Sequence, residues 1–384
     1  MAARCLEDLP STSLRGGLRR ELDVAVVGAG VLGLATTDAL VRRGVDVVCF
    51  DPGRPGQGQS GGWSRSFRNR HDDPRVVGLA VESRTGWSRW EDRLGQRLIG
   101  DEGTAYAGMA ADDAHGLVVH EVSHAFVEPS RQAEVFGALA PMDGLLLHDP
   151  ASGAIRARRT IDALVGWVGS RIVPAEVHGV TAPGDGDGAE LHTADGIFRA
   201  RHVVIAAGTA TPRLAAGAGI EIPLDRRLHA RPHFRVREEF RGAGLPCWVD
   251  RSGAFGETVY GSPMGRTGQY VVGLIGADVD IPMNDGLPPA TEMEAHVRRV
   301  SAYVTWAFPG FDPEPVGVRV CVMTKLPAGS DAFGVWQTDG ISAVTGHNLF
   351  KLAPALGEIL ADTAVKNEVP DEVADLTRRA VVAP

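Results

Sequence analysis

A glycine-rich turn near the N-terminus constrains the fold of this chain more than any other segment. An apolar run from Asp23 to Val27 leads into Gly28-Ala29-Gly30-Val31-Leu32-Gly33, and a helical pattern then runs through Leu40 and stops at Gly44. Gly28 permits the tight turn, Gly30 lets a pyrophosphate approach the backbone, and Gly33 lets the helix pack closely on the strand. The phosphates would face a helix N-terminus, which favours anions. The alternative is a turn that merely joins a strand to a helix.

The acid after the second strand narrows the choice of nucleotide. A strand from Val45 to Phe50 ends at Asp51, 18 residues after Gly33. A carboxylate there can accept hydrogen bonds from a ribose diol, and its charge would repel a 2′-phosphate. The sequence therefore favours FAD or NAD over NADP.

Composition excludes several classes of partner. The chain has 384 residues, of which 44% are hydrophobic and 23% charged, and its net charge is -9. No segment approaches the roughly 18 continuous apolar residues of a membrane helix. A negative net charge disfavours binding to nucleic acid or to an anionic membrane, because both need a basic face. We expect a small-molecule substrate, no nucleic acid and no membrane.

The N-terminus and the cysteines carry no further targeting or metal signal. Residues 1–21 lack a continuous apolar core and are expected to form a tail of a cytoplasmic protein. The cysteines lack CxxC or other ligand spacing, so we predict neither a zinc site nor a disulfide framework.

The rest of the chain predicts an α/β fold with two domains. Helical patterns occupy 72–96 and 159–171, and strands are expected at 189–198, 201–206 and 340–345, before a helix over 352–365. Alternating segments at 233–236, 258–260 and 270–274 are typical of an antiparallel sheet. We predict a Rossmann-type nucleotide-binding domain over 22–96, 150–222 and 317–384, and a second domain, an antiparallel β-sheet plus helices, over 97–149 and 223–316.

Three separated segments resemble one family. Gly58-Gln59-Ser60-Gly61-Gly62-Trp63-Ser64-Arg65-Ser66-Phe67-Arg68 resembles the flavin-contacting loop of the monomeric sarcosine oxidase-like enzymes of the D-amino-acid oxidase superfamily. Cys321-Val322-Met323-Thr324-Lys325 is similar to that family's flavin-attachment strand, and Thr345-Gly346-His347-Asn348-Leu349-Phe350-Lys351 to its Gly-His-Gly-Phe-Lys turn. The resemblance runs from Asp23 to about Val365 in the same order and spacing.

The resemblance implies FAD, tethered through the sulfur of Cys321 to the 8α-methyl carbon of the flavin. A thiolate near an electron-poor ring is a suitable nucleophile, whereas the alternative is a buried strand cysteine that fills space. The segment that begins at Gly346 also opens a helix, whose positive end would favour an electron-rich flavin. The implied cofactor-binding residues are Gly28, Gly30, Gly33, Asp51, Ser60, Gly62, Arg65, Cys321, Gly346, Asn348 and Lys351.

The resemblance also implies an anionic substrate. Arg68 and Lys351 match the arginine and lysine that hold the substrate carboxylate in the family, and a guanidinium can bind a carboxylate with two parallel hydrogen bonds. Arg65 matches an arginine that lies against the flavin ring, and Tyr260 is a pocket candidate on a substrate-facing strand. The alternative for the arginines is a solvated basic loop.

Two departures from the family pattern concern the flavin. Ser60 and Gly61 stand where the family has histidines, so flavin contacts there must differ. The lysine that activates oxygen in the family falls near Val271, where this chain has no lysine. Arg266, Lys325 or Arg65 could substitute, or another electron acceptor could be used.

The implied activity is oxidation of the C–N bond of an amino acid or secondary amine that bears a carboxylate, such as a sarcosine-like, N-methyl or cyclic amino acid. Hydride would pass to flavin N5, an imine would form, and oxygen or another acceptor would reoxidise the flavin. We expect a monomer, and an oxidase more than a dehydrogenase. Two alternatives stay open, a nicotinamide-dependent dehydrogenase and a non-catalytic flavin-binding protein.

Overall fold

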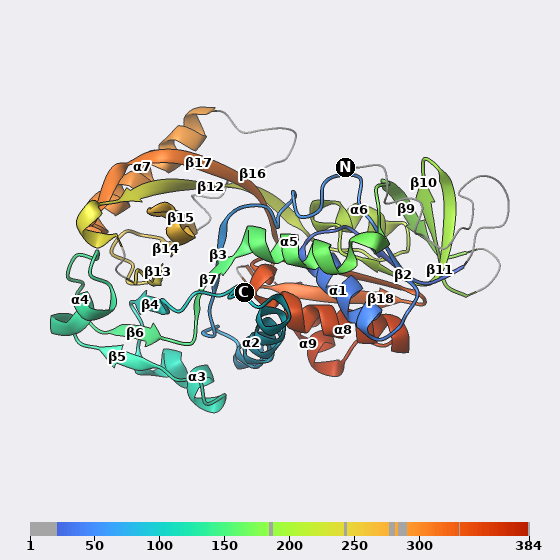
Figure 1. Cartoon of the computed structure of the whole chain (residues 1–384), viewed down its shortest axis with the longest axis horizontal. Coiled ribbons are helices and arrows are strands. Elements are labelled where there is room, and N and C mark those ends of the chain that lie inside the picture. The colour runs from blue at the N-terminus through green and yellow to red at the C-terminus, as the bar shows by residue number, and fades with distance from the viewer. Residues whose placement is uncertain are drawn as a thin grey trace. The chain divides into compact units, whose positions relative to one another are not determined.

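The computed structural model describes residues 21–183, 187–241, 244–275, 281–282, 290–329 and 331–382 (Figure 1). The predicted tail lies outside the described residues except for Glu21. The chain divides into two compact units. The first comprises the residues up to Gly61, Ile161–Asp225 and the residues from Thr324 onward, and the second comprises Gly62–Thr160 and Arg226–Met323.

The first unit is built on a largely parallel sheet with the strand order β18-β19-β11-β1-β2-β8. β1 pairs in parallel with β11 and β2, β11 pairs in parallel with β19, and β18 runs antiparallel at the edge. This arrangement confirms the predicted Rossmann-type fold. The strands of this unit are β1 (Leu22–Val27), β2 (Val47–Phe50), β8 (Ile172–Val173), β9 (Val177–Thr181), β10 (Ala189–Thr193), β11 (Gly196–Ile205), β18 (Phe333–Thr338) and β19 (Ile341–Gly346).

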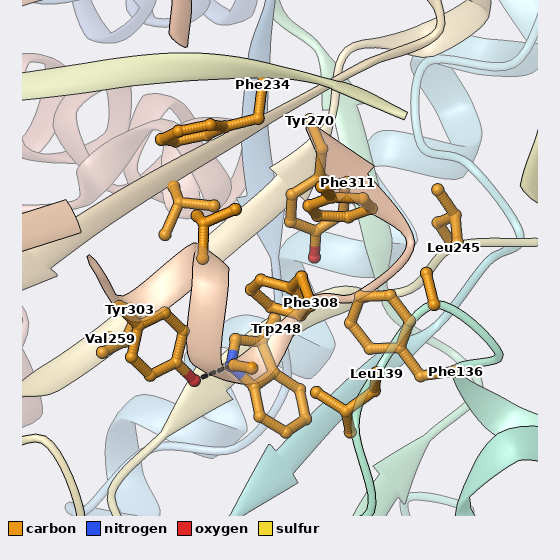
Figure 2. Close-up of a cluster of buried hydrophobic side chains, with 14 of the residues drawn as sticks. Phe136, Leu139, Phe234, Leu245, Trp248, Val259, Tyr270, Tyr303, Phe308 and Phe311 are labelled. Carbon is orange, nitrogen blue, oxygen red and sulfur yellow. Dashed lines mark hydrogen bonds between the residues drawn. The ribbon is translucent and has the colours of Figure 1, made fainter. Parts of the chain in front are cut away.

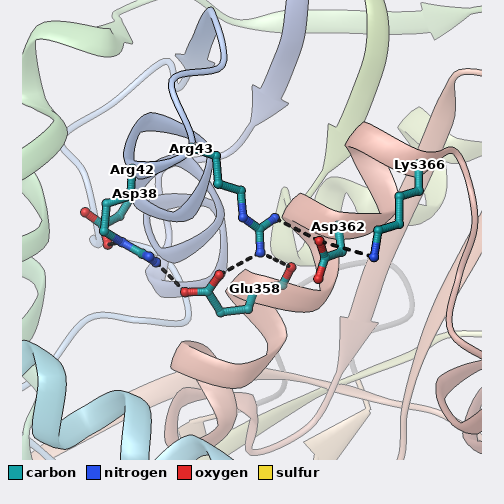
Figure 3. Close-up of polar contacts among 6 residues, drawn as sticks. All are labelled: Asp38, Arg42, Arg43, Glu358, Asp362 and Lys366. Carbon is teal, nitrogen blue, oxygen red and sulfur yellow. Dashed lines mark hydrogen bonds and ion pairs between the residues drawn. The ribbon is translucent and has the colours of Figure 1, made fainter.

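Helices α1 (Val31–Arg42) and α8 (Ala353–Lys366) pack against each other in the first unit. A Cβ on Gly357 would stand 2.7 Å from the Cβ of Ala35, so the glycine allows the close approach. Arg42 and Arg43 at the end of α1 form ion pairs with Glu358, and Arg43 also reaches Asp362 at 3.3 Å (Figure 3). The predicted helix over 352–365 is confirmed, with its proline in the first turn.

Other helices of the chain are α5 (Ala157–Val168), α6 (Thr211–Ala216) and α9 (Asp371–Ala380). A buried cluster that includes Val27, Phe50, Ile205 and Ile341 fills one side of the first unit's sheet. These residues come from four strands of the sheet, so the apolar runs seen in the sequence are buried between layers.

The second unit contains a mostly antiparallel sheet with the order β16-β12-β15-β14-β13-β4-β6-β5, and β17 pairs with β12. The alternating segments of the sequence lie in β12, β14 and β15, which pair antiparallel as predicted. The strands are β4 (Thr104–Ala107), β5 (Ala125–Val127), β6 (Leu146–Asp149), β12 (Asp225–Val236), β13 (Cys247–Asp250), β14 (Thr258–Pro263), β15 (Gln269–Ile275), β16 (Ile281–Pro282) and β17 (Phe311–Lys325).

Helix α7 (Ala290–Ala307) covers this sheet through a core rich in aromatic side chains (Figure 2). The indole N–H of Trp248 donates a hydrogen bond of 2.7 Å to the hydroxyl of Tyr303, which donates in turn to Asp250 at 2.8 Å. All three side chains are buried, and the chain of hydrogen bonds satisfies polar groups that would otherwise be costly to bury.

Residues 62–96 lie in the second unit, although the sequence analysis assigned them to the nucleotide-binding domain. β3 (Ser64–Phe67) pairs with β7 (Gly153–Arg156), and Val77 of α2 (Pro74–Leu94) packs into a cluster with Tyr106 of β4. The strand pairing and the side-chain cluster join residues far apart in the sequence, which explains why chain order alone suggested a different division.

Candidate active site

The glycine turn after β1 has the geometry that its three glycines were expected to allow. Gly28 has a positive φ of 104°, and a Cβ there would stand 2.5 Å from the carbonyl oxygen of Ala206. A Cβ on Gly33 would lie 1.8 Å from the carbonyl oxygen of Gly28, so only glycine lets α1 pack this close to the turn. A Cβ on Gly30 would meet only the hydroxyl of Ser60, at 3.2 Å.

Asp51 and Ser60 both bind backbone N–H groups of this turn. Asp51 accepts hydrogen bonds from the amides of Ala29 at 2.7 Å and Gly53 at 2.9 Å, and Ser60 accepts one from Val31 at 2.9 Å. Gly30 is the N-cap of α1 and offers no side chain to the remaining amides of the first turn. The helix N-terminus, whose N-cap glycine makes no side-chain cap hydrogen bond, fits a pyrophosphate.

A chain of hydrogen bonds joins the loop before Ser60 to the turn after β19. The side-chain amide of Gln59 donates to the hydroxyl of Thr324 at 3.0 Å. That hydroxyl donates to the backbone carbonyl oxygen of Gly346 at 2.8 Å. A Cβ on Gly346 would stand 2.5 Å from the Cβ of Phe333, so this position also requires glycine. The first unit thus brings together the segments around Gly28, Ser60 and Gly346 that the sequence had singled out.

Asp331 orders the rest of that turn. Asn348, in the left-handed conformation with a φ of 59°, donates to Asp331 at 2.9 Å, and the ammonium of Lys351 forms an ion pair with the same carboxylate at 3.1 Å. Lys351 is 3% exposed, and a buried ammonium needs such a partner. Sequence reasoning missed Asp331, which carries no local motif.

In the second unit, Arg65 lies with Arg319 beside Gly62. The Nη1 atom of Arg65 is 2.9 Å and the Nε atom of Arg319 is 3.4 Å from the point where a Cβ on Gly62 would stand. Burial lowers the pKa of Arg65 to about 9; Arg231 adds to this effect, and Cys321 opposes it. Arg65 therefore remains a cation at neutral pH, and its charge interacts with Cys321, for which the sequence predicts flavin attachment.

Tyr260 is held by two basic side chains of β12. Its hydroxyl makes a 2.7 Å hydrogen bond with Nε2 of His229, and the two rings stack with centroids 5.6 Å apart. The guanidinium carbon of Arg231 lies 5.6 Å from the centre of the Tyr260 ring, a cation–π contact. Burial raises the pKa of Tyr260, so its phenol is protonated at neutral pH and can donate a hydrogen bond.

Arg68 and Arg70, which follow β3, differ in burial. Arg70 is buried and forms ion pairs with Asp72 at 2.6 Å and Asp113 at 2.7 Å, which makes it part of the fold. Arg68 is half-buried beside Tyr106. Burial raises the pKa of Tyr106, while Arg68 and Arg70 act in the opposite direction.

Three cysteines lie in the described part of the chain and differ in access. Cys49 and Cys247 are fully buried, and burial raises the pKa of Cys49 to about 12 and that of Cys247 still further. Cys321, on β17, is half-exposed. Of these thiols, Cys321 is therefore the one that a ligand can approach. The described residues hold no group of three or more His, Cys, Asp and Glu side chains suited to a metal ion.

The position where the family has its oxygen-activating lysine is apolar in this chain, as the sequence indicated. Val271 is 2% exposed in β15, where it lies opposite His233 of β12 and Ser262 of β14. Three cations were suggested as substitutes for the oxygen-activating lysine. The charge of Arg65 interacts with Cys321, and the side chain of Arg266 lies outside the described part of the chain.

Arg231 and Arg319 were missed by sequence reasoning, although a signal existed. Alternate residues of a strand face the same side, so Arg231 shares a face with His229 and His233, and Arg319 shares one with Cys321. The alternation of side chains along a strand therefore predicts that Arg231 lies on the face of His229 and His233, and Arg319 on the face of Cys321.

Comparison with known proteins gives matches along almost the whole chain. A model of the FAD dependent oxidoreductase family matches residues 23–363. Monomeric sarcosine oxidase of Bacillus sp. (strain NS-129) is 24% identical over 377 residues, which cover 92% of this chain and 95% of that protein. Peroxisomal sarcosine oxidase of Homo sapiens is 24% identical over 371 residues, covering 90% of this chain and 92% of that protein.

Solved structures agree on the fold. The crystal structure of L-proline dehydrogenase from P. horikoshii aligns with a TM-score of 0.79 at 19% identity, covering 93% of this chain and 96% of that one. The resemblance read from the three separated motifs of the sequence is thereby confirmed at the level of family and fold.

Proposed function

The chain belongs to the family of FAD-dependent oxidoreductases, and on this premise we propose that it oxidises the C–N bond of an amino acid or secondary amine that bears a carboxylate. The observation that carries the proposal is the match of nearly the whole chain to monomeric sarcosine oxidase, together with basic side chains at the corresponding positions. FAD, when bound, accepts a hydride from the carbon next to the amine nitrogen, which leaves an imine that water can hydrolyse.

In the first unit, the residues proposed to hold FAD lie at the turn after β1, at the end of β2 and after β19. The amides at the start of α1 bind the pyrophosphate, and Asp51, already fixed against the turn, accepts from the ribose. The amides of the segment from Gly346 to Lys351 would serve as hydrogen-bond donors to the flavin. Arg65 of the second unit would supply a positive charge to it. Arg65 remains charged even though burial lowers its pKa, which supports this role.

We propose Arg68 and Lys351 as the carboxylate-binding pair. The guanidinium of Arg68 forms the bidentate contact, and the ammonium of Lys351 adds a second positive charge. Asp331 holds Lys351 in position but also offsets its charge. Arg68 is therefore the main determinant of affinity for the carboxylate in this proposal, and Tyr260 is a hydrogen-bond donor in the substrate pocket.

The covalent tether is proposed at Cys321. Its half-exposed sulfur and the neighbouring cation of Arg65 favour this thiol over the two fully buried ones. The electron acceptor is proposed to be oxygen or another small acceptor, with Arg65 as the cation that replaces the family lysine. A cytoplasmic monomer remains part of the prediction, and gel filtration of the purified protein tests the monomer.

An anaerobic titration tests the proposed function. Sarcosine, L-proline and L-alanine, added separately to the purified yellow protein, represent N-methyl, cyclic and primary amino acids. We expect at least one class to bleach the flavin without oxygen, and admission of air to restore the colour if oxygen is the acceptor. A yellow protein that no amino acid or secondary amine bleaches would support the alternative of a flavin-binding protein without turnover. A colourless protein that reduces NAD would support the nicotinamide alternative.

A further inference from the structure

A group of basic side chains in the second unit surrounds Tyr260 and Cys321. Arg231 and His229 of β12 contact Tyr260, and Arg319 of β17 lies with Arg65 beside Gly62. His233 belongs to the same group, because burial lowers its pKa and the charges of Arg231 and Arg319 lower it further. We call Arg231 and Arg319 the arginine pair.

The arginine pair has no acidic counterpart in the fold. Arg231 is 8% exposed, and the Nε atoms of both guanidinium groups are buried without a hydrogen-bond partner among the described residues. No Asp or Glu in the described part of the chain forms an ion pair with either arginine. Arg70, in contrast, has two carboxylate partners.

Cations of like charge repel each other, and burial of Arg231 and of the Nε atom of Arg319 removes hydration, so a compensating anion would stabilise this group. The arginine pair therefore resembles an anion-binding site more than a structural ion-pair network. A planar guanidinium with an unused Nε–H can donate to a carboxylate through Nε and one terminal nitrogen.

The arginine pair has no proposed role in binding FAD or the first carboxylate of the substrate. The pyrophosphate is proposed at the start of α1, and Arg65 is proposed for the flavin ring. Arg68, the proposed carboxylate ligand, acts by its charge on Tyr106, whereas Arg231 lies over the Tyr260 ring and the charges of the arginine pair act on Arg65. Two further positive charges thus call for another negative group.

We propose that Arg231 and Arg319 bind a second carboxylate of the substrate, so that the chain acts on amino acids or secondary amines with two acidic groups. The inference rests on the proposed function and narrows its substrate class. In this proposal the Nε2–H of His229 donates to the phenol oxygen of Tyr260, which leaves the O–H of Tyr260 to donate a hydrogen bond to the same end of the substrate.

Binding of non-oxidisable acids to the yellow holoprotein tests the inference without turnover. Butyrate carries one carboxylate and glutarate carries two, and each is titrated while the flavin absorption spectrum is recorded. We expect glutarate to bind at least about tenfold more tightly than butyrate, because the second carboxylate gains charge-assisted hydrogen bonds. Equal affinities for the two acids would overturn the inference.

Arg231→Gln and Arg319→Gln are the informative variants, and Arg235→Gln is the matched control. Arg235 is an exposed arginine on the same strand as Arg231. Each informative variant should remove most of the preference for glutarate, while the control keeps it. If both variants still prefer glutarate to butyrate, the assignment of the second carboxylate site is contradicted. The same holds if both variants lose flavin but the remaining holoprotein keeps the preference. Arg319 is half-buried, so its variant is informative even if Arg231→Gln fails to fold.

Oxidation assays separate failure of this inference from failure of the proposed function. N-methyl-aspartate and N-methyl-glutamate join sarcosine and L-proline in the anaerobic titration. Suppose that sarcosine or L-proline bleaches the flavin at least as well as the two diacids, and that glutarate is not preferred. Amine oxidation is then supported, and the inferred preference for substrates with two carboxylates is refuted. A glutarate preference with no bleaching by any of the four compounds supports the anion site and refutes amine oxidation.

Discussion

Arg65 in β3 and Arg70 just after it differ because of the side chains that each one meets. Arg70 forms ion pairs with Asp72 and Asp113, whereas the charges of Arg231 and Arg319 lower the pKa of the buried Arg65. A guanidinium with two carboxylate partners stabilises the fold, whereas one among cations is suited to hold an anion. The two residues are of the same type and lie five positions apart, so residue type alone does not distinguish the two environments.

Replacement of Arg68 by alanine should weaken binding of carboxylate ligands more than it changes flavin content. Loss of a charge-assisted contact costs about 1.5–3 kcal/mol, which corresponds to an increase in Kd of roughly 10- to 150-fold. The measurement is a titration of the holoprotein with butyrate. Arg70→Ala is the contrast, because removal of its two ion pairs should lower the Tm instead. Unchanged affinity in Arg68→Ala would remove this residue from the carboxylate site.

Replacement of Cys321 by alanine should release the pigment. After acid precipitation, the yellow colour of the wild-type protein is expected in the pellet and that of the variant in the supernatant, because only the variant lacks the carbon–sulfur bond. Cys49→Ala is the control, since the thiol of Cys49 is fully buried and burial raises its pKa to about 12. Colour in the wild-type supernatant would show that the flavin is not covalently bound.

At the scale of elements, the first βα connection depends on contacts that tolerate no side chain. Gly33 lies in the first turn of α1, and its Cα faces the carbonyl of Gly28 at the end of β1. The far end of α1 is fixed separately, by ion pairs from Arg42 and Arg43 to Glu358 of α8 (Figure 3). The helix therefore has little freedom to move away from a bulkier residue at its start.

Gly33→Ala should consequently destabilise the protein and reduce bound FAD. Overpacking of this kind costs about 1–3 kcal/mol, and the shift of the helix would also displace the amides proposed for the pyrophosphate. Gly166→Ala in α5 is the control, because nothing lies within 4 Å of a Cβ at that site. That variant should gain about 0.5–1 kcal/mol of stability. Urea unfolding and the ratio of flavin to protein measure both effects, and a neutral Gly33→Ala would contradict the packing argument.

At the scale of the whole molecule, stability depends on buried groups that must stay uncharged. His202 of β11 is 2% exposed and makes a 3.0 Å hydrogen bond with the hydroxyl of Ser342. Burial lowers its pKa from 6.5 to about 4. The neutral imidazole is thus part of the folded sheet of the first unit.

Stability should therefore fall as the pH decreases from about 6.5 to about 4. In this range the unfolded chain binds a proton at His202 that the folded chain does not bind, so protonation favours unfolding. The full shift corresponds to about 3 kcal/mol at most. Urea unfolding of wild type and of His202→Gln across this range gives the measurement. The variant should show a smaller loss of stability at low pH, and equal pH dependence in both proteins would contradict the assignment.

The sequence by itself determined the features that depend on neighbours along the chain. Gly28, Gly30 and Gly33, the apolar runs beside them and the acid at Asp51 are close enough in sequence to specify a strand, a turn, a helix and a second strand. The separated motifs around Arg65, Cys321 and Gly346 identified the family, because their order and residue types are distinctive even without a known fold.

Only the tertiary structure decided which distant side chains meet. Asp331 meets Lys351 because β18 and β19 pair antiparallel and bring their outer ends together. The placement of residues 62–96 in the second unit and the arginine pair around Tyr260 and Cys321 depend on strands far apart in the chain. Charge and burial act through space, so a residue's electrostatic role is set by neighbours that a linear pattern does not reveal. For that reason the sequence specified the nucleotide turn, while the proposed recognition of a second carboxylate became visible only in the folded chain.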